Sequence, residues 1–141
     1  MHDRFMQAAL AEAGKAFKKE EVPVGCVAVK EGRIIARAHN LRETNADPLA
    51  HAEILCMKKA ARKLGGWYLH KVVLYSTLEP CLMCAGAMIH ARIKDIVFGA
   101  SDPKAGASKV LKKYSVNVTK GVRKEECRRI LKDFFRSLRK K

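Results

Sequence analysis

Apolar positions along the chain follow two spacings, which predict helices and strands in a mixed order. Over residues 5–17 the apolar residues return every three or four positions, with Asp3 as a candidate N-cap, as is typical of an amphipathic helix. Continuous short runs such as Val72–Tyr75 are instead typical of buried strands. The predicted helices are 5–17, 51–64, 81–92 and a last one through 127–138, and the predicted strands are 22–29, 34–39, 72–75, 96–98 and 116–118.

Turn residues separate these elements and indicate how they are connected. Glu31-Gly32 joins two strands as a hairpin, and Gly65-Gly66 ends the second helix. The polar segments 40–48 and 99–106 are predicted loops. Buried strands that alternate with helices indicate an α/β domain of three layers, α-β-α, with a central mixed five-stranded sheet and helices on both of its faces.

Length and composition favour one globular domain over residues 1–141. The chain is 48% hydrophobic, which is enough for a sizeable core. No apolar stretch approaches the roughly 20 residues of a membrane helix, and the first residues lack the pattern of a signal peptide. The five cysteines are an odd number, and most stand singly. We therefore expect a cytoplasmic protein with reduced thiols that does not enter a membrane.

The net charge of +15 is concentrated in the last third of the chain. Residues 1–100 hold 15 Lys or Arg and 10 Asp or Glu, whereas residues 101–141 hold 14 and 4. A solvated helix face could account for this excess, and so could a thermophilic surface, but such surfaces usually balance Lys with Glu. The scarcity of acids favours a polyanionic partner. The candidate phosphate contacts are Lys132, Arg136, Arg139, Lys140 and Lys141.

Two short stretches contain the candidate chemistry, residues 51–53 (His-Ala-Glu) and residues 80–84 (Pro-Cys-Leu-Met-Cys). Cys81 and Cys84 are three residues apart, so they lie on one face of a helical turn and can bind a single metal ion. His51 supplies a third ligand from another part of the chain. Three protein ligands leave one coordination position for water, as in a catalytic zinc site.

The spacing of His51 and Glu53 restricts where that metal can lie. Two residues apart on a helix, their side chains point about 200° away from each other. We therefore expect the metal beyond the N-terminal end of the helix, whose start is predicted at Asp47-Pro48. Pro80 similarly suits the start of the helix that follows it.

Neither stretch is specific when it is taken alone. A His-x-Glu pair arises often by chance. A Cys-x-x-Cys pair also occurs in structural zinc knuckles, which need a fourth protein ligand, and in thioredoxin-like redox sites, which leave Glu53 without a role. Cys26, Cys56 and Cys127 stand singly and form no second pair. Together and in this order, the two stretches match the signature of zinc nucleobase and nucleoside deaminases.

Further stretches agree with that signature over nearly the whole chain. They are Glu21-Val22-Pro23-Val24-Gly25, Asn40, residues 47–53, residues 77–90, Phe98-Gly99-Ala100, Asp102, Lys104, Gly106 and residues 133–136. With them the chain resembles the bacterial tRNA-specific adenosine deaminases, which have the cytidine deaminase fold. The resemblance implies conversion of the wobble adenosine of a tRNA anticodon stem-loop to inosine, one zinc ion per chain and a homodimer.

The resemblance also implies roles for individual residues. His51, Cys81 and Cys84 would hold zinc, and Glu53 would shuttle protons. Substrate contacts are implied for Asn40 and Val24 in the base pocket, for Asp102 and Lys104 in a loop beside the RNA, and for Phe135, Arg136 and Arg139 on the last helix. Phe135 also lies at the edge of the apolar stripe of that helix, about 100° from Phe134, so core packing is its alternative role.

One segment departs from the family. Between Gly106 and Gly121 the chain is shorter than the usual bacterial members, which have a longer connection with an Asn-His pair before the last strand. Contacts that relatives make there cannot be transferred to this chain. The candidate metal ligands lie outside the segment.

The expected reaction is hydrolysis of a cyclic amidine C–N bond. A zinc-bound hydroxide would be the nucleophile, and Glu53 would take up its proton, protonate adenine N1 and return a proton to the departing ammonia. Two alternatives remain open. One is a zinc deaminase of a free nucleobase or nucleoside, such as guanine, cytosine or cytidine, which has no use for a basic C-terminal third. The other is a non-catalytic, zinc-stabilised RNA-binding module, which would tolerate loss of Glu53.

Overall fold

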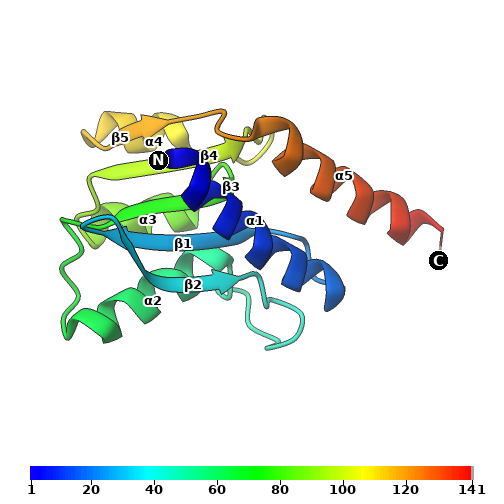
Figure 1. The fold of residues 1–141 in the computed structure, drawn as a ribbon, viewed down its shortest axis with the longest axis horizontal. Coiled ribbons are helices and arrows are strands. Elements are labelled where there is room, and N and C mark those ends of the chain that lie inside the picture. The colour runs from blue at the N-terminus through cyan, green and yellow to red at the C-terminus, as the bar shows by residue number, and fades with distance from the viewer. Residues whose placement is uncertain (141) are drawn as a thin grey trace.

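The structure, a computed structural model, describes residues 1–140, so the predicted phosphate contact Lys141 lies outside the described residues. Figure 1 shows the order of the elements along the chain. The helices are α1 (His2–Lys18), α2 (Ala52–Leu64), α3 (Leu82–His90), α4 (Ser108–Lys113) and α5 (Lys124–Arg139). The strands are β1 (Gly25–Lys30), β2 (Arg33–His39), β3 (Val73–Leu78), β4 (Asp95–Ala100) and β5 (Asn117–Thr119).

The five strands form one mixed sheet in the order β2-β1-β3-β4-β5. β1 is antiparallel to both of its neighbours, whereas β4 is parallel to β3 and to β5. It follows that β2, β3, β4 and β5 all run in one direction and end at the same edge of the sheet. Ligand sites of open α/β sheets are usually found at that edge.

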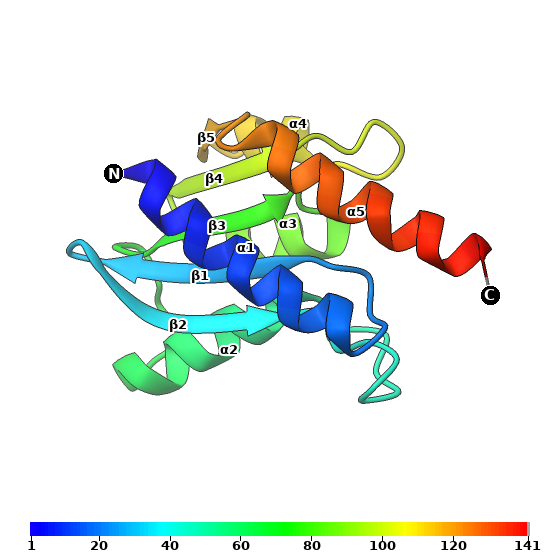
Figure 2. The same cartoon turned by 45° about the vertical axis from the view of Figure 1, so that its right-hand side comes forward.

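Helices cover both faces of the sheet, as predicted. α1 and α5 cross one face, and α2, α3 and α4 lie on the other (Figures 1 and 2). Successive residues of the central strands point to opposite faces. Val27 and Tyr75 pack in the cluster that contains residues of α1, whereas their neighbours Ala28 and Leu74 pack in the cluster of α2 and α3. The three-layer α/β prediction is confirmed.

The termini of several elements differ from the predictions. The cap at Asp3 is wrong, because Met1 is the N-cap of α1 and the Asp3 carboxylate accepts two 2.8 Å hydrogen bonds from Arg123. The helix start at Asp47-Pro48 is also wrong. Asp47 Oδ1 accepts a hydrogen bond from the backbone N–H of Leu49 (2.9 Å), as an N-cap would, but the carbonyl of Ala50 then bonds the N–H of Leu41 (3.1 Å), and α2 begins only at Ala52.

Other boundaries shift by a few residues. β1 begins at Gly25 instead of residue 22, because the preceding segment, with Pro23, curls so that the Val24 N–H bonds the carbonyl of Val22 (2.9 Å). α3 stops at His90, before Arg92, whose φ of 66° lies in the left-handed region. β3, β4 and β5 cover Val73–Leu78, Asp95–Ala100 and Asn117–Thr119.

The connection between Gly106 and Gly121 contains a helix that sequence reasoning missed. α4 has six residues, too few for its periodicity to stand out, and it is held by the fully buried Leu111. The end of α5 also differs. Cys127 and Phe134 are buried as predicted, but Leu138 is 43% exposed, so the last turn of α5 extends beyond the body of the domain (Figure 2).

No helix within residues 1–140 is both long enough and apolar enough to span a membrane.

Candidate active site

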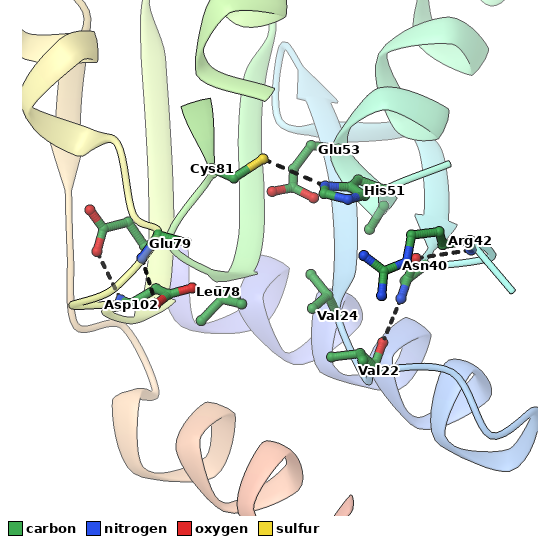
Figure 3. Close-up of a pocket in the computed structure, with 12 residues that line it drawn as sticks. Val22, Val24, Asn40, Arg42, His51, Glu53, Leu78, Glu79, Cys81 and Asp102 are labelled. Carbon is green, nitrogen blue, oxygen red and sulfur yellow. Dashed lines mark hydrogen bonds between the residues drawn. The ribbon is translucent and has the colours of Figure 1, made fainter. Parts of the chain in front are cut away.

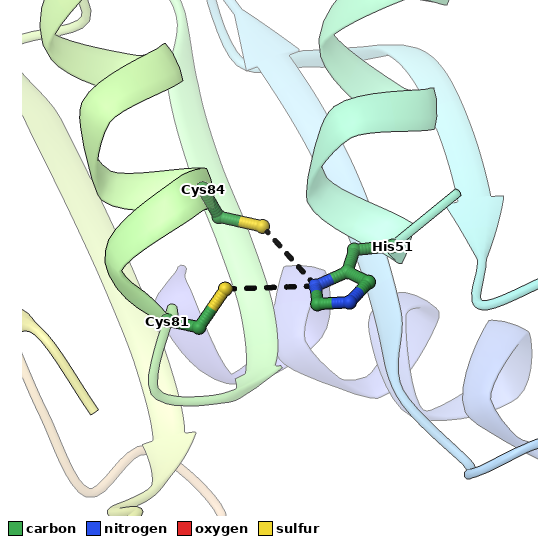
Figure 4. A group of neighbouring side chains, drawn as sticks. All are labelled: His51, Cys81 and Cys84. Carbon is green, nitrogen blue, oxygen red and sulfur yellow. Dashed lines mark hydrogen bonds between the residues drawn. The ribbon is translucent and has the colours of Figure 1, made fainter. Parts of the chain in front are cut away.

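The three predicted metal ligands meet where two helices begin. His51 is the N-cap residue of α2, Cys81 is the N-cap residue of α3, and Cys84 lies in the first turn of α3. The Nδ1 atom of His51 is 3.6 Å from the sulfur of Cys81 and 3.6 Å from that of Cys84 (Figure 4). The three ligand atoms all lie within 4.8 Å of one another.

The backbone of His51 explains how it shares a target with Glu53. His51 has φ −70° and ψ 151°, an extended conformation, so the 200° separation expected within a helix does not apply to this pair. Glu53 is in the first turn of α2 and is 4% exposed. Its carboxyl group lies between the side chains of Cys81 and His51 (Figure 3). Two segments distant in sequence thus bring four reactive groups together.

The donor set fits a zinc ion. With Zn–S bonds of about 2.3 Å and a Zn–N bond of about 2.05 Å, tetrahedral coordination separates each sulfur from the nitrogen by about 3.6 Å. This is the separation between Nδ1 of His51 and both sulfurs. Among the described residues these three supply the only such cluster of His, Cys, Asp and Glu, so a fourth position is left for a non-protein ligand.

The site shifts the pKa values of its groups in opposite directions. Burial raises the pKa of Glu53 to about 7, so its carboxyl group is able to gain and lose a proton near neutral pH. Hydrogen bonds from the Cys84 thiol and from His51 lower the pKa of Cys81 to about 3. The Cys81 sulfur raises the pKa of Cys84, and burial adds to this effect. Cys81 is therefore a thiolate, which is the form that binds a metal.

A cavity of about 190 Å³ opens beside the metal ligands (Figure 3). This volume is below the roughly 300–1,000 Å³ of pockets for drug-sized ligands and suits a small planar group such as a nucleobase. Val24 and Leu78 contribute apolar walls, and Asn40 and Glu53 contribute polar groups. The full lining is Val22, Val24, Asn40, Arg42, His51, Ala52, Glu53, Leu78, Glu79, Cys81, Asp102 and Ala105.

Three of the predicted substrate-binding residues, Val24, Asn40 and Asp102, line this cavity. The Asn40 amide donates to the carbonyl of Val22 (3.2 Å) and accepts from the backbone N–H of Arg42 (3.1 Å), so it also orders the wall. Lys104 is exposed in the same loop as Asp102 but does not line the cavity. Their contacts with a substrate stay predictions.

The predicted contacts on α5 lie apart from the cavity, on an exposed surface. Phe134 points inward and packs edge-on against Phe17, with 5.7 Å between ring centroids. Phe135 is 44% exposed, so its alternative role in the core is wrong. Arg136 and Arg139 are also exposed. A groove of about 590 Å³ runs between α5 and the end of β4. Its charged lining residues are the cations Arg128, Arg129, Lys132 and Arg136 and the acids Glu125 and Asp133, so cations are in excess.

Sequence reasoning missed three residues that shape the cavity. Glu21 is 1% exposed and accepts hydrogen bonds from the backbone N–H groups of Glu43 (3.1 Å) and Thr44 (2.6 Å). Glu79 similarly accepts from the backbone N–H of Asp102, in the loop that follows β4, and from that of Ser108, the first residue of α4. Arg42 lines the cavity from the opposite loop. The available signal was an acid within two residues of a Pro, as in Glu21-Val22-Pro23 and Glu79-Pro80.

Fold and site together define a class of protein. A mixed five-stranded sheet between helical layers, with His, two Cys and a buried Glu at the edge where its parallel strands end, is the arrangement of deaminases with the cytidine deaminase-like fold. The chain belongs to the MafB19-like deaminase family, which matches residues 1–139. The resemblance predicted from the motifs is confirmed.

Several relatives are similar over most of the chain. The tRNA-specific adenosine deaminase of Bacillus subtilis (strain 168) is 50% identical over 145 residues, which cover 97% of this chain and 90% of that protein. A solved structure from a study of A-to-I editing by tRNA:A34 deaminases at the wobble position of transfer RNA has a TM-score of 0.87 and 41% identity, covering 91% of this chain and 99% of that chain. The solved structure of a guanine deaminase from Bacillus subtilis has a TM-score of 0.69 and 34% identity, covering 79% of this chain and 75% of that chain.

Proposed function

We propose that this chain is a zinc-dependent deaminase that converts the wobble adenosine of tRNA to inosine. One observation supports the chemistry above all others, the buried Glu53 beside the His51, Cys81 and Cys84 ligands at the wall of a cavity of base size. The identity of 50% to a tRNA-specific adenosine deaminase supports the substrate.

His51, Cys81 and Cys84 would hold one zinc ion per chain. Bound zinc supplies a Lewis acid that lowers the pKa of a water molecule toward about 7. The protein contributes two sulfurs and one imidazole, and Cys81 is already a thiolate before metal binds. The two helix N-termini at the site add positive potential that stabilises the sulfur anions.

Glu53 would move the protons of the reaction. Water supplies the oxygen that replaces the exocyclic amine at C6 of adenine, and Glu53 accepts the proton that this water loses. The same carboxyl group passes that proton to N1, which makes C6 more electrophilic, and then takes the proton of the hydroxyl now on C6 and transfers it to the departing ammonia. Water and adenosine are thereby converted to inosine and ammonia. Burial, which raises the pKa of Glu53 to about 7, suits it to both transfers.

The basic surface supports an RNA substrate over a free base. α5 and the groove beside it present exposed cations that can bind phosphates, and Phe135 offers an exposed ring for stacking on a base. The adenine must leave its stack to enter the cavity, which costs least in a single-stranded loop such as an anticodon. We further propose that the protein acts in the cytoplasm as a homodimer.

A substrate comparison tests this proposal. The purified protein is incubated separately with an anticodon stem-loop that has adenosine at the wobble position, the same stem-loop with cytidine there, free adenosine, free cytidine and free guanine. Inosine and ammonia formation are followed with time. We expect rapid inosine formation only in the adenosine stem-loop. Faster ammonia release from guanine or cytidine would instead establish a free-base or nucleoside deaminase, and no reaction with any of them would favour a non-catalytic RNA-binding module.

The exposed cations at the end of α5 yield a prediction about salt. Replacing Arg136, Arg139 and Lys140 by Gln should flatten the dependence of log affinity for the stem-loop on log salt by about 2, since each phosphate contact accounts for roughly 0.7. Binding is measured between low and moderate salt. The control variant removes three exposed cations, Lys58, Arg62 and Lys63, from α2 on the opposite face.

The two variants have the same net charge, so the comparison separates local contacts from the overall field. We expect the α2 variant to retain the salt slope of the unmodified protein and the α5 variant to lose part of it. Equal slopes in the two variants would show that α5 is only a solvated surface.

A further inference from the structure

We infer that Glu79 is a positioning residue, whose carboxylate holds the loop of residues 101–107 against the Cys81 segment in the conformation that receives substrate. This inference rests on the proposed function and adds to it. Glu79 contacts neither the candidate metal ligands nor, in the mechanism above, the reacting atoms. Its effect is exerted through the loop, which contributes Asp102 and Ala105 to the wall of the cavity.

Both oxygens of the Glu79 carboxylate accept hydrogen bonds, one from the start of this loop and one from the first residue of α4, which follows it. Oε1 accepts a hydrogen bond from the backbone N–H of Asp102 (2.9 Å), and Oε2 accepts one from the backbone N–H of Ser108 (3.1 Å). The carboxylate therefore bridges the two ends of the loop. Its backbone takes part as well, because the Glu79 N–H donates to the carbonyl of Ala100 (2.8 Å).

The same short segment that contains Glu79 also contains a metal ligand. The N–H of Ala107 donates to the carbonyl of Pro80 (2.8 Å), and Cys81 forms an isolated antiparallel bridge with Gly106. The loop and the Cys81 segment thus form one hydrogen-bonded unit. This unit fixes the distance between the candidate metal site and the wall formed by Asp102.

Gly106 gives independent support for the bridge. A Cβ atom added at Gly106 would overlap the carboxyl group of Glu79. Gly106 is not among the residues with positive φ, so its backbone conformation is open to other residues. The space that this glycine leaves is therefore occupied by the Glu79 carboxylate. The absence of a side chain at Gly106 allows the carboxylate to reach both N–H groups.

The other attachments of the loop lie at its C-terminal end, where Ala107 bonds Pro80 and Gly106 pairs with Cys81, so the first half of the loop depends on Glu79. Ser101, Pro103, Lys104, Ala105 and Gly106 are exposed, and within the loop only Ala107 is buried. Internal hydrogen bonds from Lys104 and Ala105 to the Asp102 carboxylate stabilise the turn but do not attach it to the domain. Without the Glu79 bridge, substrate would have to order the first half of the loop, which contains Asp102, on binding. The apparent affinity is then the intrinsic affinity multiplied by the fraction of molecules in which the loop is already ordered.

Two substitutions test the bridge from its two sides. In Glu79→Gln the amide NH₂ faces one of the two backbone N–H groups, so at most one hydrogen bond remains. In Gly106→Ala the new methyl group displaces the carboxylate. Gly14→Ala is the matched control, because a Cβ atom there meets nothing within 4 Å. The readouts are zinc content, hydrogen exchange of the Asp102 and Ser108 amides, and kcat and KM for the adenosine stem-loop.

We expect both variants to retain zinc and to exchange these two amides faster, with amides of α3 still protected. KM should rise about tenfold in each variant while kcat changes by less than about threefold, as for a loop that is ordered in roughly one molecule in ten. The double variant should be no worse than the more affected single variant, since both remove the same contact. Gly14→Ala should behave as the unmodified protein does.

Three results would contradict this role of Glu79. Loss of zinc or of the folded state in Glu79→Gln would show that the residue belongs to the core of the fold, and unchanged exchange of the two amides would show that the bridge does not order the loop. A fall in kcat at constant KM would show a loss of active enzyme instead of a loosened loop. If the unmodified protein fails to deaminate the stem-loop, the proposed function is wrong, but the exchange measurement still tests the bridge.

Discussion

Replacing Glu53 by Gln should lower kcat for the adenosine stem-loop by about 10²–10⁴, the range that a positioned general acid–base contributes. The amide has nearly the shape of the carboxyl group but is unable to accept a proton from water or to return one to ammonia. Since Glu53 is 4% exposed and its neighbours are the candidate metal ligands, no other described carboxylate in the cavity reaches the same place. Inosine formation under single-turnover conditions measures the change.

The controls for this variant are zinc content and affinity for the stem-loop, both of which should stay close to those of the unmodified protein. Asp102→Asn is a matched comparison, because it also neutralises a carboxylate at the cavity wall but leaves Glu53 in place. Its kcat should fall far less than that of Glu53→Gln. Near-normal turnover by a folded Glu53→Gln protein would contradict the proposed proton shuttle and assign the transfers to another group.

Removal of a metal ligand should have the second large effect. In Cys84→Ala two protein ligands remain, so zinc should be lost, and activity with it. Binding to the folded state alone stabilises a protein by about 4 kcal/mol when the free ligand exceeds its dissociation constant a thousandfold. We therefore expect Cys84→Ala to melt at a lower temperature than the unmodified, zinc-bound protein. A chelator should lower the melting temperature of the unmodified protein but not that of Cys84→Ala.

A second buried cysteine provides the control for the loss of packing. Cys127→Ala also removes a fully buried sulfur, but from the cluster between α1, α5 and the sheet, away from the metal ligands. It should lose some stability and retain its zinc and its response to chelator. Elemental analysis of both variants measures the metal directly. Full zinc content in Cys84→Ala would remove this residue from the site.

The sequence by itself predicted the layers and the candidate chemistry of the site. Consecutive residues of β1 and β3, such as Val27 and Ala28, are buried on opposite faces of the sheet. The continuous apolar runs that indicate a sheet covered on both faces are readable without coordinates. The metal-ligand spacing of Cys81 and Cys84 is likewise local, since it depends on one helical turn. The pairing of these cysteines with His51 came from the order of two motifs typical of a known family.

Helix boundaries were predicted less well, because they depend on contacts outside the helix. The backbone at His51 is extended, which lets it share a target with Glu53, and the carbonyl of Ala50 just before it bonds the N–H of Leu41 in a distant loop instead of a helical N–H. Similarly, α4 is stabilised by the burial of Leu111, and a helix of six residues is too short for its apolar periodicity to be recognised in the sequence.

Only the tertiary structure decided how the walls of the cavity are held. Glu21 and Glu79 bond loops that lie 22 to 29 residues further along the chain. A hydrophobic pattern shows that a position is buried, but it does not show which backbone N–H groups a buried carboxylate will meet. The outward position of Phe135 was decided in the same way, since Phe134 beside it takes the place against Phe17 of α1. Local spacing determines which side chains a segment can present, and long-range packing determines which partners they find.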